Sequence, residues 1–375
     1  MPANLLSVES FGTPIWGLSP RDQVGALPDR CDVLIVGGGI TGLGLLHWLR
    51  PIPGVVLVEQ DRLGAGASGR SAGFLLAGTA SCYAVAVRRF GRRRAQELWH
   101  FTVETHELLA EALGGRARSY RRLGSYTQPA SPQEALDLEE SVLLLREDGA
   151  DVRLQEGRLL NPGDGELNPL EALLVLAARA RPGSVREGVK VDGLDAGTDG
   201  VRVRAGEAEC LAGAVILATN AYTGQLVPGA PITPVRAQMA ASAGERPGLV
   251  ERPTYSDEGY QYWRQLADGT LLAGGYRNHF LTTEVGYEAV PTPQLQACLD
   301  EHLRGLGQSG RTSHRWAGIM GFTQTELPLV GPLPDLPNVY LSAGYNGHGM
   351  AYAFNCAKRL AEHLIGRRRV HDLFP

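Results

Sequence analysis

The feature that most constrains the fold of this chain is a run of glycines directly after a short apolar stretch. Residues 32–36 read DVLIV, a β-branched run typical of a buried strand, and residues 37–42 read GGGITG. Residues 40–50 continue with a helical pattern, and residues 55–58 form a second apolar run. A strand, a glycine turn, a helix and a second strand in this order predict a βαβ unit within a parallel sheet.

The spacing of the glycines fits G-x-G-x-x-G, and each glycine has a physical reason. Gly37 permits a tight turn, Gly39 lets the backbone approach a pyrophosphate, and Gly42 lets the helix pack closely on the strand. The helix N-terminus then offers unpaired N–H groups to the phosphates. Glu59 ends the second strand, where a carboxylate accepts hydrogen bonds from a ribose diol. The predicted dinucleotide contacts of this motif are Gly37, Gly39, Ile40, Thr41, Gly42, Glu59 and Gln60.

A second glycine-rich stretch, GAGASGRSAG at residues 64–73, follows soon after. FAD extends beyond its ADP half, and the small residues of this stretch would let the backbone closely approach the ribityl chain and the flavin. Read alone, the stretch is equally typical of a flexible surface loop. The predicted FAD contacts in it are Ala67, Ser68, Gly69, Arg70, Ser71, Ala72 and Gly73.

Composition narrows the class of protein. The chain has 375 residues, 43% of them apolar, and a net charge of −4, so it is long enough for two domains and has no basic field to attract nucleic acid or an anionic membrane. The arginines at 88, 89, 92, 93 and 94 indicate a solvated helix face rather than a phosphate site. No apolar run is long enough for a transmembrane helix, and we expect no signal peptide in residues 1–16.

The five cysteines are scattered and contain no CxxC pair. This pattern favours neither a zinc site nor a disulfide scaffold, so we expect no metal centre. Free thiols are typical of a reducing compartment, and we therefore predict a cytoplasmic protein.

The remaining elements suggest a discontinuous organisation. Helices are predicted over 80–113 with a break at Gly91, and over 132–148, 169–180, 292–306 and 347–365. Strands are predicted at 201–203, 214–217 and 338–341, with more between 230 and 322. We predict an α/β Rossmann-like FAD-binding domain with a discontinuous, mainly antiparallel substrate domain. The predicted boundaries are 1–30 for a lead-in, 31–80, 150–225 and 323–370 for the FAD domain, and 81–149 and 226–322 for the substrate domain.

Three further stretches carry a family resemblance. They are VILATNAYT at 215–223, HRWAGIMGFTQTELPLVG at 314–331 and NVYLSAGYNGHGMAYAF at 338–354. Together with the two glycine loops, they resemble the FAD-dependent D-amino-acid-oxidase superfamily, which includes glycine and sarcosine oxidases, and especially its branch similar to γ-glutamylputrescine oxidases. One departure is Ser71-Ala72, where that branch usually shows Asn-Gly. The resemblance implies bound FAD and adds contacts from Val189, Ala218, Thr219 and Met320.

The loop at 344–350 joins a strand to a helix. Backbone N–H groups at a helix N-terminus suit the negative charge that two-electron reduction places on the flavin pyrimidine edge. The predicted contacts are Gly344, Tyr345, Asn346, Gly347, His348, Gly349 and Met350. His348 is either a turn residue or a group that handles a proton.

Met320 carries two implications of the resemblance. Sarcosine-oxidase-like relatives have a flavin-linking cysteine there, and a thioether forms no thiolate, so FAD is expected to be non-covalent. Glycine-oxidase-like relatives place a carboxylate-binding arginine near this point. A larger amine is therefore the better prediction, unless Arg264 or Arg277 binds a carboxylate.

Strand alternation around residue 262 gives the catalytic candidates. It would put Tyr260, Tyr262 and Arg264 on one face, either as a substrate pocket with one cation or as ordinary sheet packing. The predicted catalytic residues are Tyr262, Arg264 and His348.

The predicted reaction is oxidation of the C–N bond of an amine or amino acid by hydride transfer to flavin N5, followed by hydrolysis of the imine. The electron acceptor is O₂, a quinone or a protein carrier. One alternative is a 2-hydroxy-acid or alcohol dehydrogenase on the same scaffold. A second is a flavin-holding interaction protein without turnover.

Overall fold

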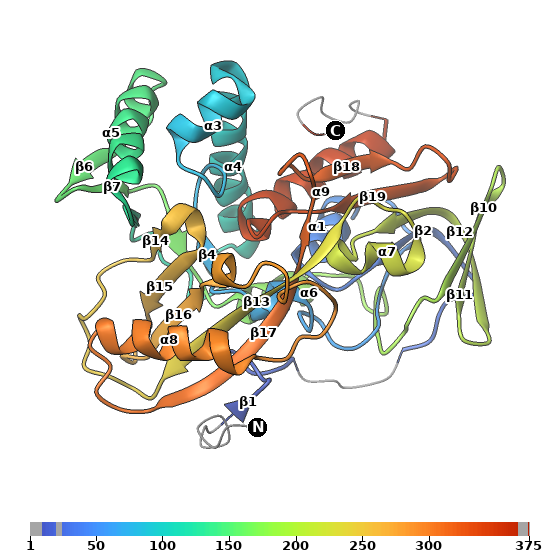
Figure 1. The fold of residues 1–375 in the computed structure, drawn as a ribbon. Coiled ribbons are helices and arrows are strands. Elements are labelled where there is room, and N and C mark those ends of the chain that lie inside the picture. The colour runs from blue at the N-terminus through green and yellow to red at the C-terminus, as the bar shows by residue number, and fades with distance from the viewer. Residues whose placement is uncertain (1–9, 20–24, 367–373, 375) are drawn as a thin grey trace.

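Two large sheets lie side by side in the computed structural model, which describes residues 10–19, 25–366 and 374 (Figure 1). The expectation about a signal peptide falls largely on residues 1–9, and the end of the predicted FAD domain falls on residues 367–370. Both lie outside the described residues.

The first sheet has eight strands within the described residues and contains the predicted βαβ unit. Its parallel strands are β9 (Val185–Glu187), β3 (Val55–Glu59), β2 (Arg30–Val36), β12 (Ala208–Leu217) and β19 (Val339–Ala343). The antiparallel additions are β10 (Gly193–Gly197) and β11 (Gly200–Ala205) on the first half of β12, and β18 (Leu329–Pro332) on β19.

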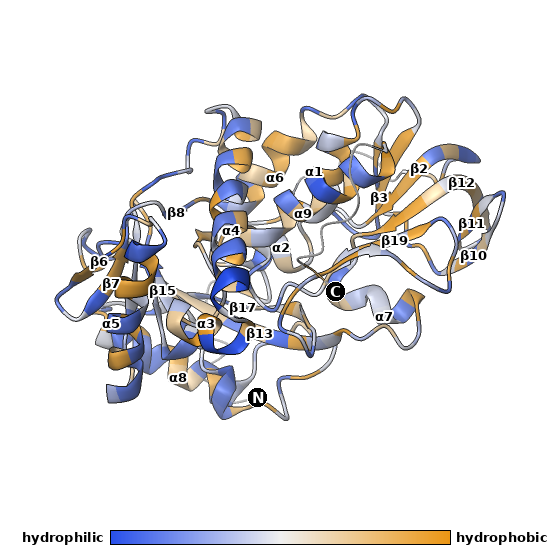
Figure 2. Ribbon diagram, turned by 90° about the horizontal axis from the view of Figure 1, so that it is seen from above, coloured by the Kyte–Doolittle hydropathy of each residue, from blue (hydrophilic) through white to orange (hydrophobic). Residues whose placement is uncertain are grey.

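Apolar residues on both faces explain why these parallel strands are buried. Val33 and Ile35 of β2 belong to one hydrophobic core, and Leu34 and Val36 belong to another on the opposite face. Figure 2 shows the hydrophobic residues concentrated along β2, β3 and β12. The first face is covered by α1 (Ile40–Trp48) and α9 (Gly349–Leu364), together with α6 (Pro169–Ala177).

The second sheet has nine strands within the described residues. In order they are β1 (Ser10–Phe11), β17 (Thr312–Phe322), β13 (Thr233–Ser242), β16 (Leu271–Gly275), β15 (Gln261–Gln265), β14 (Thr254–Ser256), β5 (Ser125–Gln128), β7 (Arg158–Asn161) and β6 (Arg153–Gln155). All neighbours are antiparallel except β1–β17 and β14–β5, so the prediction of a mainly antiparallel second sheet is confirmed.

One face of this sheet packs on α8 (Pro293–Gly305), and the other turns toward the first sheet (Figure 1). Trp263 of β15 and Ala240 of β13 contact the buried leucines of α8. Met239 and Tyr262 lie on the opposite face with Phe74. Side-chain alternation therefore gives each strand one structural face and one face available for a site.

A helical layer extends from the end of the second sheet (Figure 1). It comprises α3 (Tyr83–Phe90), α4 (Arg92–Leu113) and α5 (Pro132–Glu147). Arg88 of α3 pairs with Asp137 at 2.7 Å, and Arg92 of α4 pairs with Asp148 at 2.9 Å. The arginines of this cluster thus form exposed ion pairs that join α3 and α4 to α5, in agreement with the predicted solvated helix face.

The predicted domain boundaries stay a prediction, but two strand pairings and one helix contact cross them. Residues 10–11 pair with β17, and β6 and β7 pair beside β5, although 150–225 was assigned to the FAD domain. Helix α4 contributes Leu98, Phe101 and Leu109 to the core beneath α9, although 81–149 was assigned to the substrate domain. These contacts join segments far apart in sequence, which periodicity does not report.

The described chain also contains short elements, among them 3₁₀ helices at Asn220–Tyr222, Asp257–Gly259 and Arg277–His279. The others are short helices and strands. They are α2 (Ala67–Arg70), α7 (Thr223–Leu226), β4 (Phe74–Leu75) and β8 (Gly165–Glu166), the last two forming a small antiparallel ribbon. None of the helices in the described residues is both long and apolar enough to cross a membrane.

Candidate active site

A cavity of about 680 Å³ lies between the two sheets, beyond the carboxyl ends of β2, β3 and β12. This is the usual position for ligands in open parallel sheets. The residues predicted to contact a cofactor that line it are Gly37, Gly39, Ile40, Thr41, Glu59, Gln60, Ala67, Ser68, Arg70, Ser71, Ala72, Gly73, Val189, Ala218, Thr219, Met320, Tyr345, Asn346, Gly347, His348, Gly349 and Met350.

Three predicted contacts, Gly42, Gly69 and Gly344, do not line the cavity. A Cβ atom on Gly42 would lie 1.9 Å from the carbonyl oxygen of Gly37, and one on Gly69 would lie 2.3 Å from that of Gly64. One on Gly344 would lie 2.5 Å from the Thr323 methyl group. These glycines permit close packing of the backbone beneath the residues that line the cavity.

The backbone of the first glycine turn forms a hydrogen bond with the carboxylate of Glu59, at the end of β3. Glu59 accepts hydrogen bonds from the N–H groups of Gly38 at 2.7 Å and Asp61 at 2.9 Å. Burial raises the pKa of Glu59, although both hydrogen bonds act to lower it. At the start of α1, no side chain caps the helix from Gly39, and Ser68 accepts from the Ile40 N–H at 3.0 Å. The turn thus offers backbone donors near a fixed acceptor.

The loop before α9 is held by a polar side chain. Asn346, at a φ of 53°, donates to the Gly344 carbonyl at 2.8 Å and accepts from the Thr323 N–H at 2.9 Å. His348 precedes α9 without capping it through its side chain. The first amides of α9 are therefore presented to the cavity by a loop with a defined conformation.

An aromatic box, formed by Phe74, Tyr255, Tyr262 and His348, lines the same cavity. The Tyr255 ring centroid lies 5.6 Å from that of His348 and 5.8 Å from that of Tyr262. Phe74 lies 5.6 Å from Tyr255. Burial lowers the pKa of His348 to about 4, so its imidazole is neutral at pH 7. Burial also raises the pKa of Tyr262 to about 12, which keeps its hydroxyl protonated.

Arg264, predicted to be a catalytic residue, is not among the residues that line the cavity. Its side chain is 2% exposed, forms an ion pair with Glu166 at 3.3 Å and donates to the Leu167 carbonyl at 3.0 Å. Arg264 lies on the same sheet face as Tyr262, but β4, β8 and Trp16 cover that part of the face. Its guanidinium therefore joins β15 to the small β4–β8 ribbon, outside the cavity.

Arg277, by contrast, is one of the cationic residues that line the cavity. Its guanidinium carbon lies 4.4 Å from the Phe322 ring centroid and 4.6 Å from that of Tyr260. No carboxylate of the described residues pairs with it. Tyr276, directly before it, adopts a φ of 62°, an uncommon conformation for a tyrosine. The turn at the end of β16 thus directs Arg277 between two rings and toward the aromatic box.

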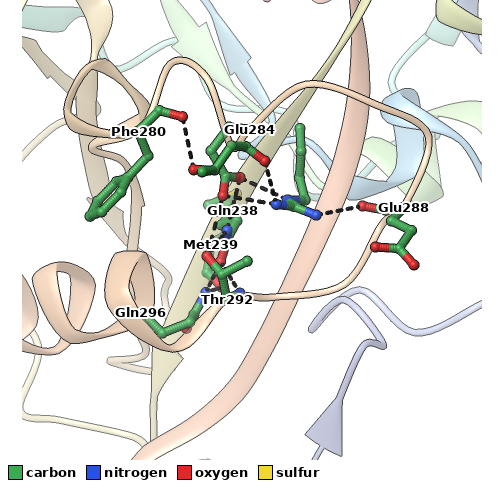
Figure 3. A network of polar contacts seen from close by, with 9 residues as sticks. Gln238, Met239, Phe280, Glu284, Glu288, Thr292 and Gln296 are labelled. Atoms are coloured by element: carbon green, nitrogen blue, oxygen red, sulfur yellow. Dashed lines mark hydrogen bonds and ion pairs between the residues drawn. The ribbon is translucent and has the colours of Figure 1, made fainter.

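The segment after Arg277 is anchored from the structural face of the sheet (Figure 3). Arg236 of β13 donates to the Glu284 carboxylate at 2.8 and 3.0 Å and to the Thr283 carbonyl at 2.9 Å. Gln238 donates to Glu284 at 2.9 Å and accepts from the Thr292 N–H at 2.9 Å. Because Glu284 is nearly fully buried, this network fixes the path of residues 280–292.

Sequence reasoning missed several residues that line the cavity. Tyr255 lies on a three-residue strand, which is too short for side-chain alternation to be recognised in the sequence. Phe322 was noted only as part of the family motif and was not predicted to line a site. Glu326 lines the cavity too and pairs with Arg89 at 2.6 Å, a contact across a long sequence separation. Arg277 was predicted only as an alternative to Arg264 for binding a carboxylate. The glycines shortly before it were the sequence signal for a turn at this position.

Comparison with known proteins decides the family. The model of the FAD dependent oxidoreductase family, DAO, matches residues 32–363. The chain belongs to this family of FAD-dependent oxidoreductases. Among curated relatives, this oxidoreductase is 28% identical to gamma-glutamylputrescine oxidoreductase of Escherichia coli, over 92% of the chain and 86% of the relative. It is 27% identical to the mitochondrial sarcosine dehydrogenase of Homo sapiens, over 97% of the chain and 42% of the relative.

Solved structures share the fold of this FAD-dependent oxidoreductase. Glycine oxidase from Geobacillus kaustophilus superposes with a TM-score of 0.76 at 21% identity, covering 92% of the chain and 97% of the relative. L-amino acid deaminase from Proteus vulgaris gives a TM-score of 0.74 at 18% identity, covering 94% and 98%. The predictions of fold class, family and FAD dependence are therefore confirmed.

The residues present fit FAD. The N-termini of α1 and α9, whose N-cap residues Gly39 and His348 form no side-chain cap hydrogen bond, open on one cavity. They are linked because the Thr41 hydroxyl donates to the Tyr345 hydroxyl at 3.0 Å. The first suits a pyrophosphate and the second suits the flavin pyrimidine edge. Glu59 is available to a ribose, and the volume is ample for an extended ligand.

Proposed function

We propose that this FAD-dependent oxidoreductase oxidises the C–N bond of an amine that also carries a carboxylate, such as an amino acid or an N-alkyl amino acid. The observation that carries the proposal is Arg277, a guanidinium in the cavity beside the aromatic box with no carboxylate partner among the described residues. A planar guanidinium binds a carboxylate through two parallel hydrogen bonds, which fixes the orientation of the substrate.

The other cations of the cavity are less suited to this role. Arg70 donates to the carbonyls of Gly12, Ala65 and Ala317, which use its guanidinium. Arg89 is neutralised by Glu326. Lys190 follows Val189, whose N–H donates to the Glu59 carbonyl, and so it lies beside the predicted ribose site.

The protein residues would divide the work between binding and proton handling. Arg277 holds the carboxylate, and the rings of Phe74, Tyr255 and Tyr262 exclude water from the carbon that is oxidised. His348 is neutral and able to take a proton from the substrate ammonium, leaving the neutral amine that oxidation requires. The chemistry that FAD supplies when bound is two-electron oxidation by hydride acceptance.

The names of relatives support substrates of this class. One curated relative is a sarcosine dehydrogenase, and another is a 4-methylaminobutanoate oxidase from Paenarthrobacter nicotinovorans, 25% identical over 90% of this chain and 44% of the relative. Both substrates combine a secondary amine with a carboxylate. We therefore propose that the amine and the carboxylate of the substrate both contact this cavity.

The test is anaerobic mixing of the FAD-loaded protein with a substrate panel while the visible flavin absorbance is recorded. The panel contains sarcosine, 4-methylaminobutanoate and glycine, N-methylpropylamine as an amine without a carboxylate, and lactate and glycolate as hydroxy acids. We expect amines with a carboxylate to bleach the flavin. Bleaching by hydroxy acids alone would favour the dehydrogenase alternative, and a flavin that no compound reduces would contradict the proposal.

Arg277→Gln tests the binding role directly. Loss of a charge-assisted bidentate contact should weaken binding of a carboxylate-bearing amine by roughly 10- to 100-fold. Arg89→Gln is the matched control, because it removes a positive charge of the same cavity that Glu326 already neutralises. Equal losses in the two variants, or no loss in Arg277→Gln, would contradict the assignment.

We also propose that FAD is bound without a covalent link, in the cytoplasm. No cysteine is among the residues lining the cavity, and the five cysteines are free thiols. Met320 stands where the family resemblance implies a flavin-linking cysteine in sarcosine-oxidase-like proteins. Acid precipitation should release all flavin into the supernatant; flavin that stays with the pellet would contradict the proposal. Reoxidation rates with O₂ and with a soluble quinone would identify the electron acceptor.

A further inference from the structure

A second, smaller cavity of about 60 Å³ lies behind the aromatic box. Tyr255, Glu258, Gly259 and His348 line both cavities, so the two spaces share a wall. We call the smaller one the rear chamber. Its other polar lining includes Ser125, Thr127, Asn161 and Asp164. His348 therefore has the substrate cavity on one side and a polar chamber on the other.

Asp164 is the buried acid of the rear chamber. It is 3% exposed, and its carboxylate accepts hydrogen bonds from the Ala77 N–H at 2.9 Å and the Ser125 hydroxyl at 2.6 Å. No arginine, lysine or histidine forms an ion pair with it in the described residues. Burial raises the pKa of Asp164 to about 7, although the hydrogen bonds from Ser125 and Ala77 act to lower it.

The rear chamber has room and partners for water. A space of about 15 Å³ is enough for a water molecule that finds two to four polar partners, and the chamber is larger than this. Ser125, Thr127, Asn161 and Asp164 supply such partners. Water in the chamber would connect the carboxylate of Asp164 with the imidazole of His348 through hydrogen bonds.

Oxidation of an amine substrate requires a path by which a proton leaves the substrate nitrogen. An ammonium cannot give up a hydride from its neighbouring carbon until one proton has left its nitrogen. His348 with a pKa of about 4 holds a proton poorly, whereas Asp164 with a pKa of about 7 holds it about 1,000-fold better. A proton taken by His348 would therefore pass onward to the carboxylate.

We propose that Asp164 is a proton-relay residue that receives, through His348 and water in the rear chamber, the proton released by the substrate ammonium. The transfer converts an ammonium and a carboxylate into a neutral amine and a carboxylic acid, with no electrons moved. The inference rests on the proposed amine oxidation. Asp164 does not touch the substrate and acts through His348.

Other ionisable groups around the chamber contribute to the electrostatic potential at Asp164. Those lining it are Cys82, Tyr83, Glu134, Tyr255, Glu258 and His348, and Arg122 acts from outside to lower the pKa of Asp164. Glu134 is occupied, because its two oxygens accept from the N–H groups of Ala130 at 2.6 Å and Glu258 at 3.1 Å. Glu258 is exposed to solvent, so Asp164 is the remaining buried acid among the residues that line the chamber.

The test compares wild type with Asp164→Asn and Ser125→Ala across pH 5 to 9. The rate of anaerobic flavin reduction is measured with sarcosine and with 4-methylaminobutanoate. We expect the wild-type rate to rise with a midpoint near 7 that is the same for both substrates, because it belongs to the protein. Asp164→Asn should remove this limb and lower the rate at pH 8 by about tenfold.

Ser125→Ala separates the relay from a merely structural role. It keeps the carboxylate but removes the hydroxyl donor that lowers the pKa of Asp164, so the midpoint should move to higher pH. Infrared difference spectra of the protein without substrate supply a second readout: a protonated carboxyl band that titrates near pH 7 and is absent in Asp164→Asn.

The outcomes are distinct. An enzyme that amines reduce, but whose Asp164→Asn variant keeps the wild-type pH profile, overturns the relay and leaves the proposed function standing. The same holds if Asp164→Asn lowers only thermal stability or flavin content. If no amine reduces the wild type, the proposed function fails and the relay fails with it.

Discussion

Replacing Gly42 by alanine should disrupt the junction between the first strand and its helix. An added Cβ atom would lie 1.9 Å from the Gly37 carbonyl oxygen, 3.1 Å from the Gly37 carbonyl carbon and 3.2 Å from a Leu57 methyl group. The carbonyl belongs to the turn backbone and cannot rotate away, so α1 and the turn must separate by about 1 Å. Overpacking of this kind costs about 3 kcal/mol of unfolding free energy.

The same displacement should weaken the cofactor site, because the N-terminal amides of α1 move away from the phosphates. We expect FAD affinity to fall by at least about tenfold. Urea unfolding of the apoprotein measures the stability change, and fluorescence quenching during FAD titration measures the affinity.

Gly66→Ala is the matched control for this prediction. Gly66 lies in the second glycine loop and lines the same cavity, but a Cβ there meets nothing within 4 Å and its φ is −79°. It should change stability by less than about 0.5 kcal/mol. Unchanged stability and FAD affinity in Gly42→Ala, or equal losses in both variants, would refute the packing argument.

Three further predictions concern buried polar groups. Arg264→Gln should lower the free energy of unfolding by about 3 kcal/mol, because it breaks a buried ion pair, while the ratio of substrate rates in the panel stays unchanged; an altered ratio with full stability would return Arg264 to the active site. Burial lowers the pKa of His106 to about 4, so between pH 6.5 and 4 the unfolded chain binds more protons and stability falls as pH falls; His106→Gln should reduce that fall by up to about 3 kcal/mol in denaturant titrations at the two pH values. Glu284→Gln should loosen the segment after Arg277 and weaken substrate binding several-fold with little change in FAD affinity, and a parallel loss of FAD affinity would contradict this separation.

Local chemistry made the cofactor half of the molecule predictable. The strand, the glycine turn and Glu59 follow each other within one βαβ unit, so their spacing alone places them at one edge of the sheet. The loop before α9 was predictable for the same reason, because a strand that ends in glycines and opens a helix presents amides at a known point.

The substrate half was less predictable because its contacts join distant segments. Alternation correctly put Tyr262 and Arg264 on one face, but the partner of Arg264 is Glu166, on a two-residue strand whose position no local pattern reports. The choice between Arg264 and Arg277 depended on which part of that face is covered, and this is a property of tertiary packing. The pairing of β6 and β7 with β5 escaped the domain prediction for the same reason.

The hydrogen-bond network around Glu284 holds the segment after Arg277 without using residues of the cavity lining. The segment that follows Arg277 is tied down from the α8 side of the sheet, by side chains that do not line the cavity (Figure 3). Position 277 can therefore change while the flavin cradle and this network keep their shape. If Arg277 binds the substrate as proposed, substitutions at this one half-buried position would change which substrates are accepted and leave the FAD site intact.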